Sequence, residues 1–347
     1  MTELAEILAA RIRAEGPLRL SDYMAECLLH PTHGYYTTRP PFGAEGDFIT
    51  APEISQMFGE LLGLCLAQSW LDQGAPSPFT LAEIGPGRGT LMADILRATR
   101  GVPGFHAAMR LRLVEASPRL RALQAQALKG YAPEWCEIEA LEGPLFLVAN
   151  EFFDALPIRQ FLRTGPAWRE RMVGLVEGRL TLGLGPVLPV PELSHRLADT
   201  TDGQIVELCP QAPGILAQIT PRLGLALILD YGGWQSRGDT FQALRAHKPT
   251  DPFAAPGEAD LTAHVDFAAL AQAAPCAHAY TTQGALLTAL GIGARSERLA
   301  RNMTGAALQN HLAATQRLTA PSEMGTLFKA LALFPAGAPQ PPGFPDA

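Results

Sequence analysis

This sequence contains no apolar run that approaches the ~20 residues needed to cross a lipid bilayer. Its mean hydropathy is +0.08, and 47% of its 347 residues are hydrophobic. Because those values are typical of a globular chain, we expect no membrane span. The length is enough for one large domain, or for a core domain with a substantial addition.

Cysteine is scarce and irregularly spaced. The five residues of this type are Cys27, Cys65, Cys136, Cys209 and Cys276. Their number is odd and no C-x-x-C pair occurs, so the sequence predicts neither a disulfide framework nor a metal site. Residues 1–24 carry acids among helically spaced apolar residues, unlike the continuous apolar centre of a signal peptide. We therefore expect a cytoplasmic protein with reduced thiols.

An excess of positive charge is also lacking. The chain has 27 Lys and Arg against 34 Asp and Glu, which gives a formal net charge of −7. Affinity for nucleic acid depends heavily on Lys and Arg side chains that neutralise phosphates. The balance of charge gives no reason to expect a nucleic-acid partner, and we predict none.

The stretch around which the chain is organised is FTLAEIGPGRGTLMADILRAT, residues 79–99. An apolar run of strand length is followed by three glycines and then by a helical apolar pattern, which predicts strand, turn and helix. The glycines are Gly85, Gly87 and Gly89. Glycines let a backbone turn sharply and approach a ligand closely. On these residues alone, a tight strand-to-helix connection without a ligand remains an alternative.

Two acidic residues give this stretch a chemical character. Glu83 lies two positions before Gly85, and a carboxylate there repels a pyrophosphate but suits a cationic or hydroxyl-rich ligand. S-adenosylmethionine, which carries a sulfonium, an ammonium and a ribose, fits this requirement. A second strand is predicted over 109–116, and its Glu115 lies 26 positions beyond Gly89. That spacing is compatible with an acid that accepts hydrogen bonds from ribose hydroxyls.

Polar residues also end the next buried strand, which is predicted over 145–149. Asn150 and Glu151 follow it directly, at the carboxyl end where open α/β sheets bind their ligands. The hydrophobic period then changes, and residues 158–187 predict β-hairpins. Strands and helices thus alternate around one sheet that carries a hairpin insertion.

Composition and hydrophobic period divide the chain into five predicted parts. These are an N-terminal helical region with a substrate- and donor-covering loop (1–78), a donor-binding Rossmann-like half (79–157), a β-hairpin insertion (158–203), a C-terminal half with a long substrate loop (204–334) and a loose Pro/Gly-rich tail (335–347). Within them, the second N-terminal helix is predicted to begin near Ser21. The stretch 234–266 is predicted to be irregular, and one helix is predicted over about 297–318.

Several long motifs resemble one protein family. They are HPTHGYY from His30, GDFITAPEISQMFGELLG from Gly46, EIGPGRGTLMADILR from Glu83, NEFFDALPIRQF from Asn150, WRERMV from Trp168 and DYGGWQSRGDTFQALRAHKPTDPFAAPGEADLTAHVDF from Asp230. Together they resemble the MidA-like family of class I methyltransferases, which includes an arginine methyltransferase of mitochondrial complex I assembly. The resemblance implies an α/β fold with a seven-stranded Rossmann-like sheet, and S-adenosylmethionine as methyl donor.

By match to these motifs, the resemblance implies roles for particular residues. The implied donor-binding residues are Glu83, Gly85, Gly87, Gly89, Glu115 and Asn150. Methyl transfer to a guanidinium calls for carboxylates that orient it through paired hydrogen bonds. The candidates are Glu151, Asp154, Glu207 and Asp47, of which Glu151 is preferred because it follows a strand end directly. A helix-cap role for Asp154 stays open, and Asp230 is either a further candidate or a structural turn acid.

The resemblance also implies a substrate. By similarity to the mitochondrial member, that substrate is an arginine in the large catalytic subunit of respiratory complex I, which is dimethylated during assembly. Two alternatives stay open: a methyltransferase that acts on a small molecule, and an assembly chaperone that binds the donor without turnover. The oligomeric state is open as well, with a homodimer among the options. The cytoplasmic location expected here is that of a bacterial member, whereas organellar relatives act in the mitochondrial matrix.

Overall fold

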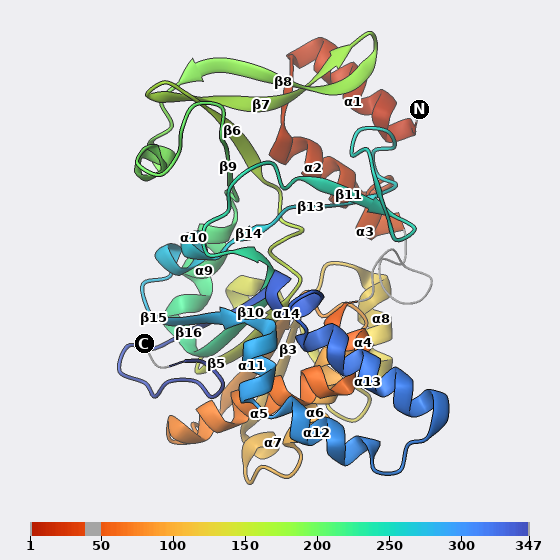
Figure 1. The fold of residues 1–347 in the computed structure, drawn as a ribbon, viewed down its shortest axis with the longest axis vertical. Helices are drawn as coiled ribbons and strands as arrows, with labels where there is room; N and C mark the ends of the chain where they lie inside the picture. The colour runs from red at the N-terminus through yellow and green to blue at the C-terminus, as the bar shows by residue number, and fades with distance from the viewer. Residues whose placement is uncertain (1, 39–49, 346–347) are drawn as a thin grey trace. The chain divides into compact units, whose positions relative to one another are not determined.

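A mixed β-sheet organises the larger of two units into which contacts within the chain divide the molecule (Figure 1). The computed structural model describes residues 2–38 and 50–345. The sheet unit comprises Ile49–Phe153, Pro213–Gly233 and Phe267–Ala347. The hairpin unit comprises Met1–Phe48, Asp154–Ala212 and Trp234–Asp266. Each unit is therefore assembled from three separate segments of the sequence.

The strands of the sheet unit lie in the order β15-β16-β10-β5-β2-β3-β4. Their bounds are β2 (Phe79–Ile84), β3 (Met109–Val114), β4 (Glu134–Trp135), β5 (Leu145–Asn150), β10 (Leu223–Gly233), β15 (Ala277–Thr282) and β16 (Phe328–Phe334). Neighbours from β10 through β4 run parallel, whereas β16 runs antiparallel to both β10 and β15. These seven strands form a mixed, Rossmann-like sheet, so the predicted fold class is confirmed.

The central strands are apolar because both of their faces are covered. Every residue of β2 and β5 is buried, as are the first nine residues of β10. Parallel strands covered on both faces show continuous apolar runs rather than alternation. The runs at 79–84 and 145–149 are therefore two of the central strands, as the sequence predicted.

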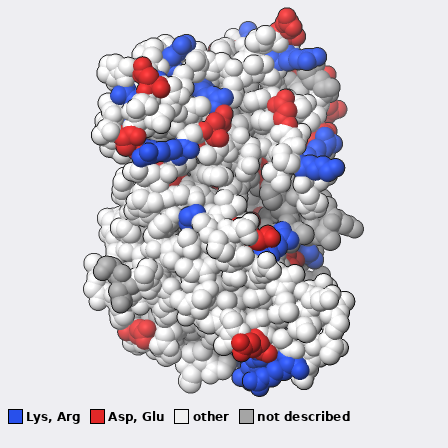
Figure 2. All heavy atoms as spheres, in the orientation of Figure 1, with Lys and Arg blue, Asp and Glu red and all other residues white. Residues whose placement is uncertain are grey.

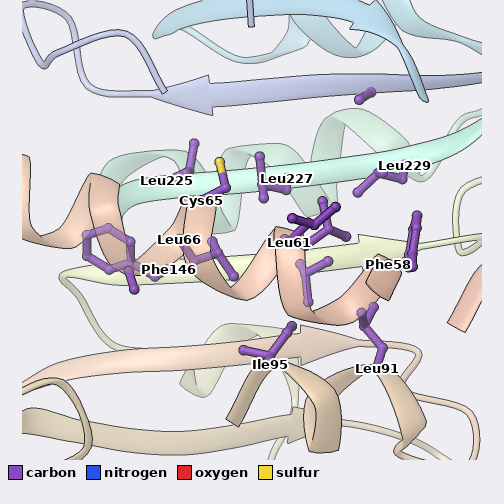
Figure 3. Packing of buried hydrophobic residues seen from close by; sticks show 14 of the residues in the cluster. Phe58, Leu61, Cys65, Leu66, Leu91, Ile95, Phe146, Leu225, Leu227 and Leu229 are labelled. Atoms are coloured by element: carbon purple, nitrogen blue, oxygen red, sulfur yellow. The ribbon is translucent and has the colours of Figure 1, made fainter. Parts of the chain in front are cut away.

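Helix α5 (Gln56–Asp72) packs much of the core of this unit. Figure 3 shows its side chains between those of β10 and those of helix α6 (Thr90–Thr99). The two helices approach closely because α5 carries Gly63, where an added Cβ would lie 2.9 Å from the Cα of Ile95. This contact holds α6, which begins directly after the glycine turn, against the core.

The other helices of this unit surround the sheet. They are α4 (Ala51–Ile54), α7 (Phe105–Ala108), α8 (Pro118–Ala127), η1 (Ile138–Ala140), α9 (Ala212–Ile219), η3 (Thr220–Arg222), α10 (Phe267–Ala273), α11 (Gln283–Ala289), α12 (Ile292–Ala300), α13 (Gly305–Thr319) and α14 (Met324–Leu327). The single helix predicted over 297–318 is wrong, because α12 and α13 are separate. The N–H of Met303 turns back to the carbonyl of Ala300 at 2.9 Å, and Gly305 has a φ of 57°, which interrupts a right-handed helix.

The C-terminal tail packs on the sheet unit, so the expectation of a loose tail is wrong for residues 335–345. Phe344 is 7% exposed, and the Sγ of Cys65 donates to the carbonyl of Pro342 at 3.3 Å. A Cβ on Gly343 would lie 2.8 Å from the side chain of Leu286. The Pro and Gly content of the tail suggested mobility, but burial of the Phe344 ring holds the tail against the sheet unit.

An antiparallel sheet forms the hairpin unit. Its strands lie in the order β1-β7-β6-β9, with β8 paired to β7. Their bounds are β1 (Leu18–Arg19), β6 (Arg159–Thr164), β7 (Ala167–Val176), β8 (Arg179–Leu188) and β9 (Ile205–Leu208). Gly165 and Gly178, in the two hairpin turns, have φ values of 55° and 78°. Such left-handed residues are typical of tight hairpins, and the predicted hairpins are confirmed.

The stretch 234–266 is not irregular as predicted. It contains a small sheet in the order β12-β11-β13. The remaining elements of the unit are α1 (Glu3–Glu15), α2 (Leu20–Leu29), α3 (Tyr35–Thr38), η2 (Pro191–Leu197), β11 (Gln242–Arg245), β12 (Lys248–Thr250), β13 (Asp260–Thr262) and β14 (Val265–Asp266). Strands this short give too few residues for an alternating pattern to stand out. Helix α2 begins at Leu20, one residue before Ser21, so the predicted start near Ser21 is confirmed, with Arg19 at the N-cap position.

Charged side chains of both signs are interspersed on the face drawn in Figure 2. That face shows no broad positive surface of the kind that binds phosphate backbones. Across residues 2–38 and 50–345, the structure contains no helix with the length and apolar character of a membrane span.

Candidate active site

Four strand ends meet at one edge of the sheet unit. The register pairs Ile84 of β2 with both Val114 of β3 and Ala149 of β5, and it pairs β10 with the last residue of β5. The residues at or just beyond these ends are therefore neighbours. They are Gly85, Glu115, Asn150, Glu151 and Asp230. Carboxyl ends of parallel strands form the ligand-binding edge of open α/β sheets.

The glycine turn after β2 depends on the backbone freedom of glycine. Gly85, Gly87 and Gly89 have φ values of 67°, 51° and 85°, in the left-handed region that other residues rarely adopt. The N–H of Gly89 donates to the carbonyl of Pro86 at 2.7 Å and closes the turn. At Gly85, a Cβ would also lie 3.1 Å from the Phe152 ring. Three of the five turn residues therefore bring backbone without a Cβ to the ligand-binding edge.

Glu83 is buried near the end of β2, with 2% of its surface exposed. Burial raises the pKa of its carboxyl to about 8; the backbone N–H of Met92 opposes the rise by a hydrogen bond, and the charge of Glu115 adds to it. Within the described residues, its Oε2 atom has no hydrogen-bond partner. A buried polar atom without a partner costs about 1–3 kcal/mol. This atom therefore favours a ligand with a positive charge or an N–H group.

Glu115 is tied to the glycine turn through Gln124 of α8. The Oε1 atom of Glu115 accepts from the N–H of Ser117 at 2.8 Å, and its Oε2 accepts from Nε2 of Gln124 at 3.2 Å. The same Nε2 donates to the carbonyl of Gly87 at 2.8 Å, and Nε1 of Trp135 donates to Oε1 of Gln124 at 2.7 Å. Burial raises the pKa of Glu115, although the hydrogen bonds that it accepts from Ser117 and Gln124 lower it. Gln124 thus locks the acid and the turn together.

The sequence did not point to Gln124. It lies inside a helix, is fully buried, and belongs to no motif that predicts a ligand contact. Its role arises only when α8 packs beside the turn, so the sequence offered no signal that could have found it.

The turn after β5 holds Glu151 in a strained conformation. Glu151 has a φ of 51°, which is uncommon for a residue other than glycine and costs on the order of 1 kcal/mol or more. Its N–H donates to the carbonyl of Leu229 at 2.8 Å. Its Oε1 atom accepts from Nδ2 of Asn150 at 3.0 Å and from the N–H of Ala51 at 3.3 Å. Strain that neighbouring contacts maintain is typical of functional sites.

Asp230 supports this turn from β10. Its carboxylate accepts from the N–H of Phe153 at 3.0 Å and from the N–H of Tyr231 at 2.9 Å. Asp230 is fully buried, and these contacts are those of a structural turn acid. Asn150, the residue before Glu151, has a buried Oδ1 atom for which the described residues provide no hydrogen-bond partner.

Glu53 of α4 is a second residue that sequence reasoning missed. Its Oε1 accepts from Oγ1 of Thr90 at 2.6 Å, and its Oε2 lies 3.6 Å from Nη1 of Arg88. Glu53 therefore connects α4 to both the glycine turn and the first residue of α6. An acid beside a proline at a helix start looks like an ordinary N-terminal residue, so only the folded chain reveals this contact.

Two predicted catalytic acids belong to the hairpin unit. The carbonyl of Asp154 accepts from the N–H of Ala263 at 2.9 Å, and no described helix begins after Asp154, so its alternative role as a helix cap is wrong. In the same unit, the hydroxyl of Tyr36 donates to Oδ1 of Asp260 at 2.8 Å. Burial, with the charges of Asp260 and Asp154, raises the pKa of Tyr36 well above its usual value. Asp154 thus lies in a buried polar cluster, and its catalytic role stays a prediction.

Glu207 is engaged within the hairpin sheet. Its Oε1 atom accepts from Nε2 of Gln160 at 2.6 Å and from the N–H of Thr240 at 3.0 Å, while its Oε2 accepts from the Thr240 hydroxyl. These contacts tie β6 and β9 to the segment that precedes β11. Asp47, the fourth predicted acid, lies outside the described residues. The catalytic roles of Glu207 and Asp47 also stay predictions.

These features fit S-adenosylmethionine. Two buried acceptor atoms, Oε2 of Glu83 and Oδ1 of Asn150, have no hydrogen-bond partner among the described residues. S-adenosylmethionine offers an ammonium and ribose hydroxyls that can donate to them. Glu115 adds an acid beside them, and the glycine turn permits close backbone approach. We predict that these residues hold the donor at this edge of the sheet.

A Glu83→Gln variant is expected to change how the stability of the ligand-free protein depends on pH. The raised pKa of Glu83 means that the folded state keeps a proton that the unfolded state releases, so its contribution is full below about pH 4.5 and is lost as pH rises through about 8. Gln stays neutral, so the variant avoids this loss, which is on the order of 3–5 kcal/mol. Thermal unfolding from pH 5 to pH 8.5 measures it.

The exposed Glu142→Gln variant provides the control for this chemical change. Parallel stability curves for the wild type and Glu83→Gln across that pH range would show that Glu83 ionises normally in the folded protein. The same variant tests the donor site, because loss of the carboxylate should weaken S-adenosylmethionine binding while the protein becomes more stable at high pH.

Known proteins share the sequence and the fold described above. Residues 61–286 match the family described as "Putative S-adenosyl-L-methionine-dependent methyltransferase". The chain is 35% identical over 372 residues to human "Protein arginine methyltransferase NDUFAF7, mitochondrial", a match that covers 96% of this chain and 84% of the human protein. It is 36% identical over 371 residues to the Drosophila melanogaster homologue, covering 96% of this chain and 85% of that protein.

A solved structure agrees with these sequence matches. A protein from Burkholderia thailandensis, bound to S-adenosyl-homocysteine, aligns with a TM-score of 0.83 and 29% identity, covering 98% of this chain and 93% of that one. The family resemblance drawn from the motifs is therefore confirmed. The sheet, the glycine turn and these matches agree, and the chain belongs to this family of S-adenosyl-L-methionine-dependent methyltransferases.

Proposed function

We propose that this chain is a protein arginine N-methyltransferase that dimethylates an arginine of a respiratory complex I subunit. The names of the human and Drosophila relatives support the arginine acceptor. The resemblance of the motifs supports the complex I partner. The observation in this molecule that carries the proposal is the strained Glu151 turn at the end of β5.

Glu151 has the chemistry that a guanidinium requires. A carboxylate can accept two parallel hydrogen bonds from the planar fork of an arginine side chain. Such pairing orients the acceptor and draws positive charge toward the paired nitrogens, so that the remaining nitrogen is a better nucleophile. We assign this orienting role to Glu151, because its turn directly adjoins the strand ends that carry the donor residues.

The surrounding residues keep this carboxylate in place before any substrate arrives. Asn150 and the N–H of Ala51 hold Oε1, and Asp230 fixes the backbone on the far side of the turn through Phe153. A group held in position loses little free energy to reorganisation when charge shifts during a reaction. S-adenosylmethionine, when bound, supplies a methyl group on a positively charged sulfur. The acceptor nitrogen would form a bond to that methyl carbon as the carbon–sulfur bond breaks, S-adenosylhomocysteine would leave with the bonding electrons on sulfur, and the nitrogen would release one proton to water.

The test is direct methylation of the proposed acceptor. Purified full-length protein is incubated with isotope-labelled S-adenosylmethionine and the purified large catalytic subunit of complex I, and mass spectrometry locates the label. We expect methyl groups on one arginine of the subunit.

Two other outcomes would overturn parts of the proposal. Label on a small molecule, with none on protein, would make the enzyme a small-molecule methyltransferase. Complex I assembly that is fully restored by a variant unable to bind the donor, with no label on the subunit, would make the protein a chaperone. Measuring donor binding in the same samples distinguishes a missing acceptor from an inactive donor site.

A further inference from the structure

Strand β8 forms an open edge of the hairpin unit. It pairs with β7 on one side, and no strand in the described part of the chain pairs with its other side. Of its ten residues, only Arg179, the first, is charged. Proteins usually protect such edges with charges, prolines or bulges. Here Pro186 and a shift in register lie only near the end of β8, so the part from Arg179 to Leu184 pairs regularly and stays open.

Apolar side chains are exposed along the same hairpin. Leu184 is 42% exposed, Val187 is 52%, Leu188 is 55%, and Val176 on β7 is 60%. Single exposed apolar residues are normal, but Leu184, Val187 and Leu188 lie within five residues of one strand, at the end of the hairpin away from Val176. Exposed apolar residues that cluster in this way favour an interaction surface. We call β8 with these four residues the β8 surface.

A cavity of about 500 Å³ adjoins the β8 surface. Its apolar walls include Pro17, Trp168, Met172, Leu184 and Leu188. Its charged members are two arginines and two glutamates: Nε and Nη2 of Arg159 donate to both carboxylate oxygens of Glu170 at 2.8 and 2.7 Å, and the other two are Arg19 and Glu192. A cavity whose charges cancel suits a neutral, apolar occupant.

Two glycines widen this cavity although the fold of the chain does not require them. Neither Gly174 nor Gly183 has a left-handed φ. An added Cβ would come no closer than 4.0 Å to a neighbour at Gly174 and 3.9 Å at Gly183. Glycine inside a strand costs roughly 0.5–1 kcal/mol relative to Ala, and it often marks a place where another backbone approaches closely. The two glycines thus point to an occupant from outside this chain.

We propose that the β8 surface and its cavity bind a second copy of this chain, with the two β8 strands pairing antiparallel across a twofold axis. An open strand edge is completed by another strand. A twofold interface places each surface against itself, which a charged strand would oppose, and β8 beyond Arg179 is uncharged. Pairing at this edge also places the partner copy beside the cavity, because β8 supplies part of its wall.

A buried N–H group beside the cavity supports a polypeptide as its occupant. The Nε1 atom of Trp168 is buried beside the cavity, and the described residues offer it no hydrogen-bond partner. A backbone carbonyl from a second chain is an acceptor of the kind that this N–H lacks.

The oligomeric state of the purified full-length protein tests this proposal. Sedimentation equilibrium at micromolar concentration should show a species of twice 37.1 kDa. Leu184→Lys, which places like charges of both copies in one interface, should raise the dimer dissociation constant by ~100-fold or more. Gly183→Ala, which narrows the cavity without strain, should raise it by roughly 10-fold while thermal stability stays the same or increases.

A matched substitution lies on the other unit. Leu64 of α5 is 46% exposed, close to the value for Leu184, and Leu64→Lys should leave the dimer intact. A monomeric wild type, or a dimer that Leu184→Lys does not weaken, would overturn the proposal. If the wild type is monomeric and Leu184→Lys instead reduces methylation of a protein substrate, the surface binds a substrate segment and not a second copy. Donor binding is measured in every variant to show that the fold is intact.

Discussion

A Gly87→Val variant is expected to bind S-adenosylmethionine at least ~100-fold more weakly than the wild type. Gly87 has a φ of 51°, and valine, branched at Cβ, is strongly disfavoured there. The turn cannot relax freely, because the carbonyl of Gly87 accepts a hydrogen bond from Gln124, which also holds Glu115. A change at this one residue therefore disturbs both the turn and the acid. Isothermal titration calorimetry measures the loss.

The same substitution at another glycine supplies the control. Gly101 has no left-handed φ, and a Cβ there would meet nothing within 4 Å. Gly101→Val should therefore bind the donor as the wild type does. Equal binding by Gly87→Val and the wild type would show that the glycine turn does not approach the donor.

A Glu151→Gln variant is expected to transfer methyl groups at least ~1000-fold more slowly, with donor binding little changed. Glutamine keeps the size of the side chain but loses the negative charge that would pair with a guanidinium. A loss in kcat at nearly constant affinity for the donor is the signature of a group that acts on the acceptor. Rates are measured under single-turnover conditions with labelled donor and the complex I subunit.

Glu177 offers a control with the same backbone. It also has a φ of 51°, but it is exposed in the turn between β7 and β8. Glu177→Gln should leave the rate unchanged, which separates the chemistry of Glu151 from any effect of the substitution on a left-handed residue. Should Glu151→Gln keep more than about a tenth of the wild-type rate, the orienting role would pass to another predicted acid.

The sequence predicted the elements whose signals are local. The strand, turn and helix at 79–99 follow from an apolar run, three glycines and a helical period, all within one short stretch. Glu115 was placed at a strand end by the same local reasoning. In the structure, the register of β2 with β3 and with β5 places the ends of these strands side by side. Neighbouring parallel strands of similar length generally end at the same edge of a sheet, so this placement could be expected.

Residues whose role depends on tertiary packing were missed. Gln124 and Glu53 reach the glycine turn from helices that contact it only after folding, and nothing in their own segments indicates a ligand site. The strand β16 (FKALALF) was also missed, although it is an apolar run of strand length; what that run does not indicate is its pairing with β10, which is distant in the sequence. The buried tail shows that composition alone misjudges a segment that carries one well-placed aromatic ring, Phe344.

The division of each unit into three segments has a consequence for synthesis and truncation. The sheet unit begins at Ile49, yet β16 (Phe328–Phe334), which pairs with the central strand β10, is synthesised long after that residue. The hairpin unit is likewise incomplete until residues 234–266 have emerged. Neither unit can finish folding while much of the chain is still unmade, because its contacts join residues far apart in sequence. No single cut in the chain yields either unit whole. A fragment ending before Phe328 would lack β16, the strand that pairs with residues Ala226 to Tyr231 of β10.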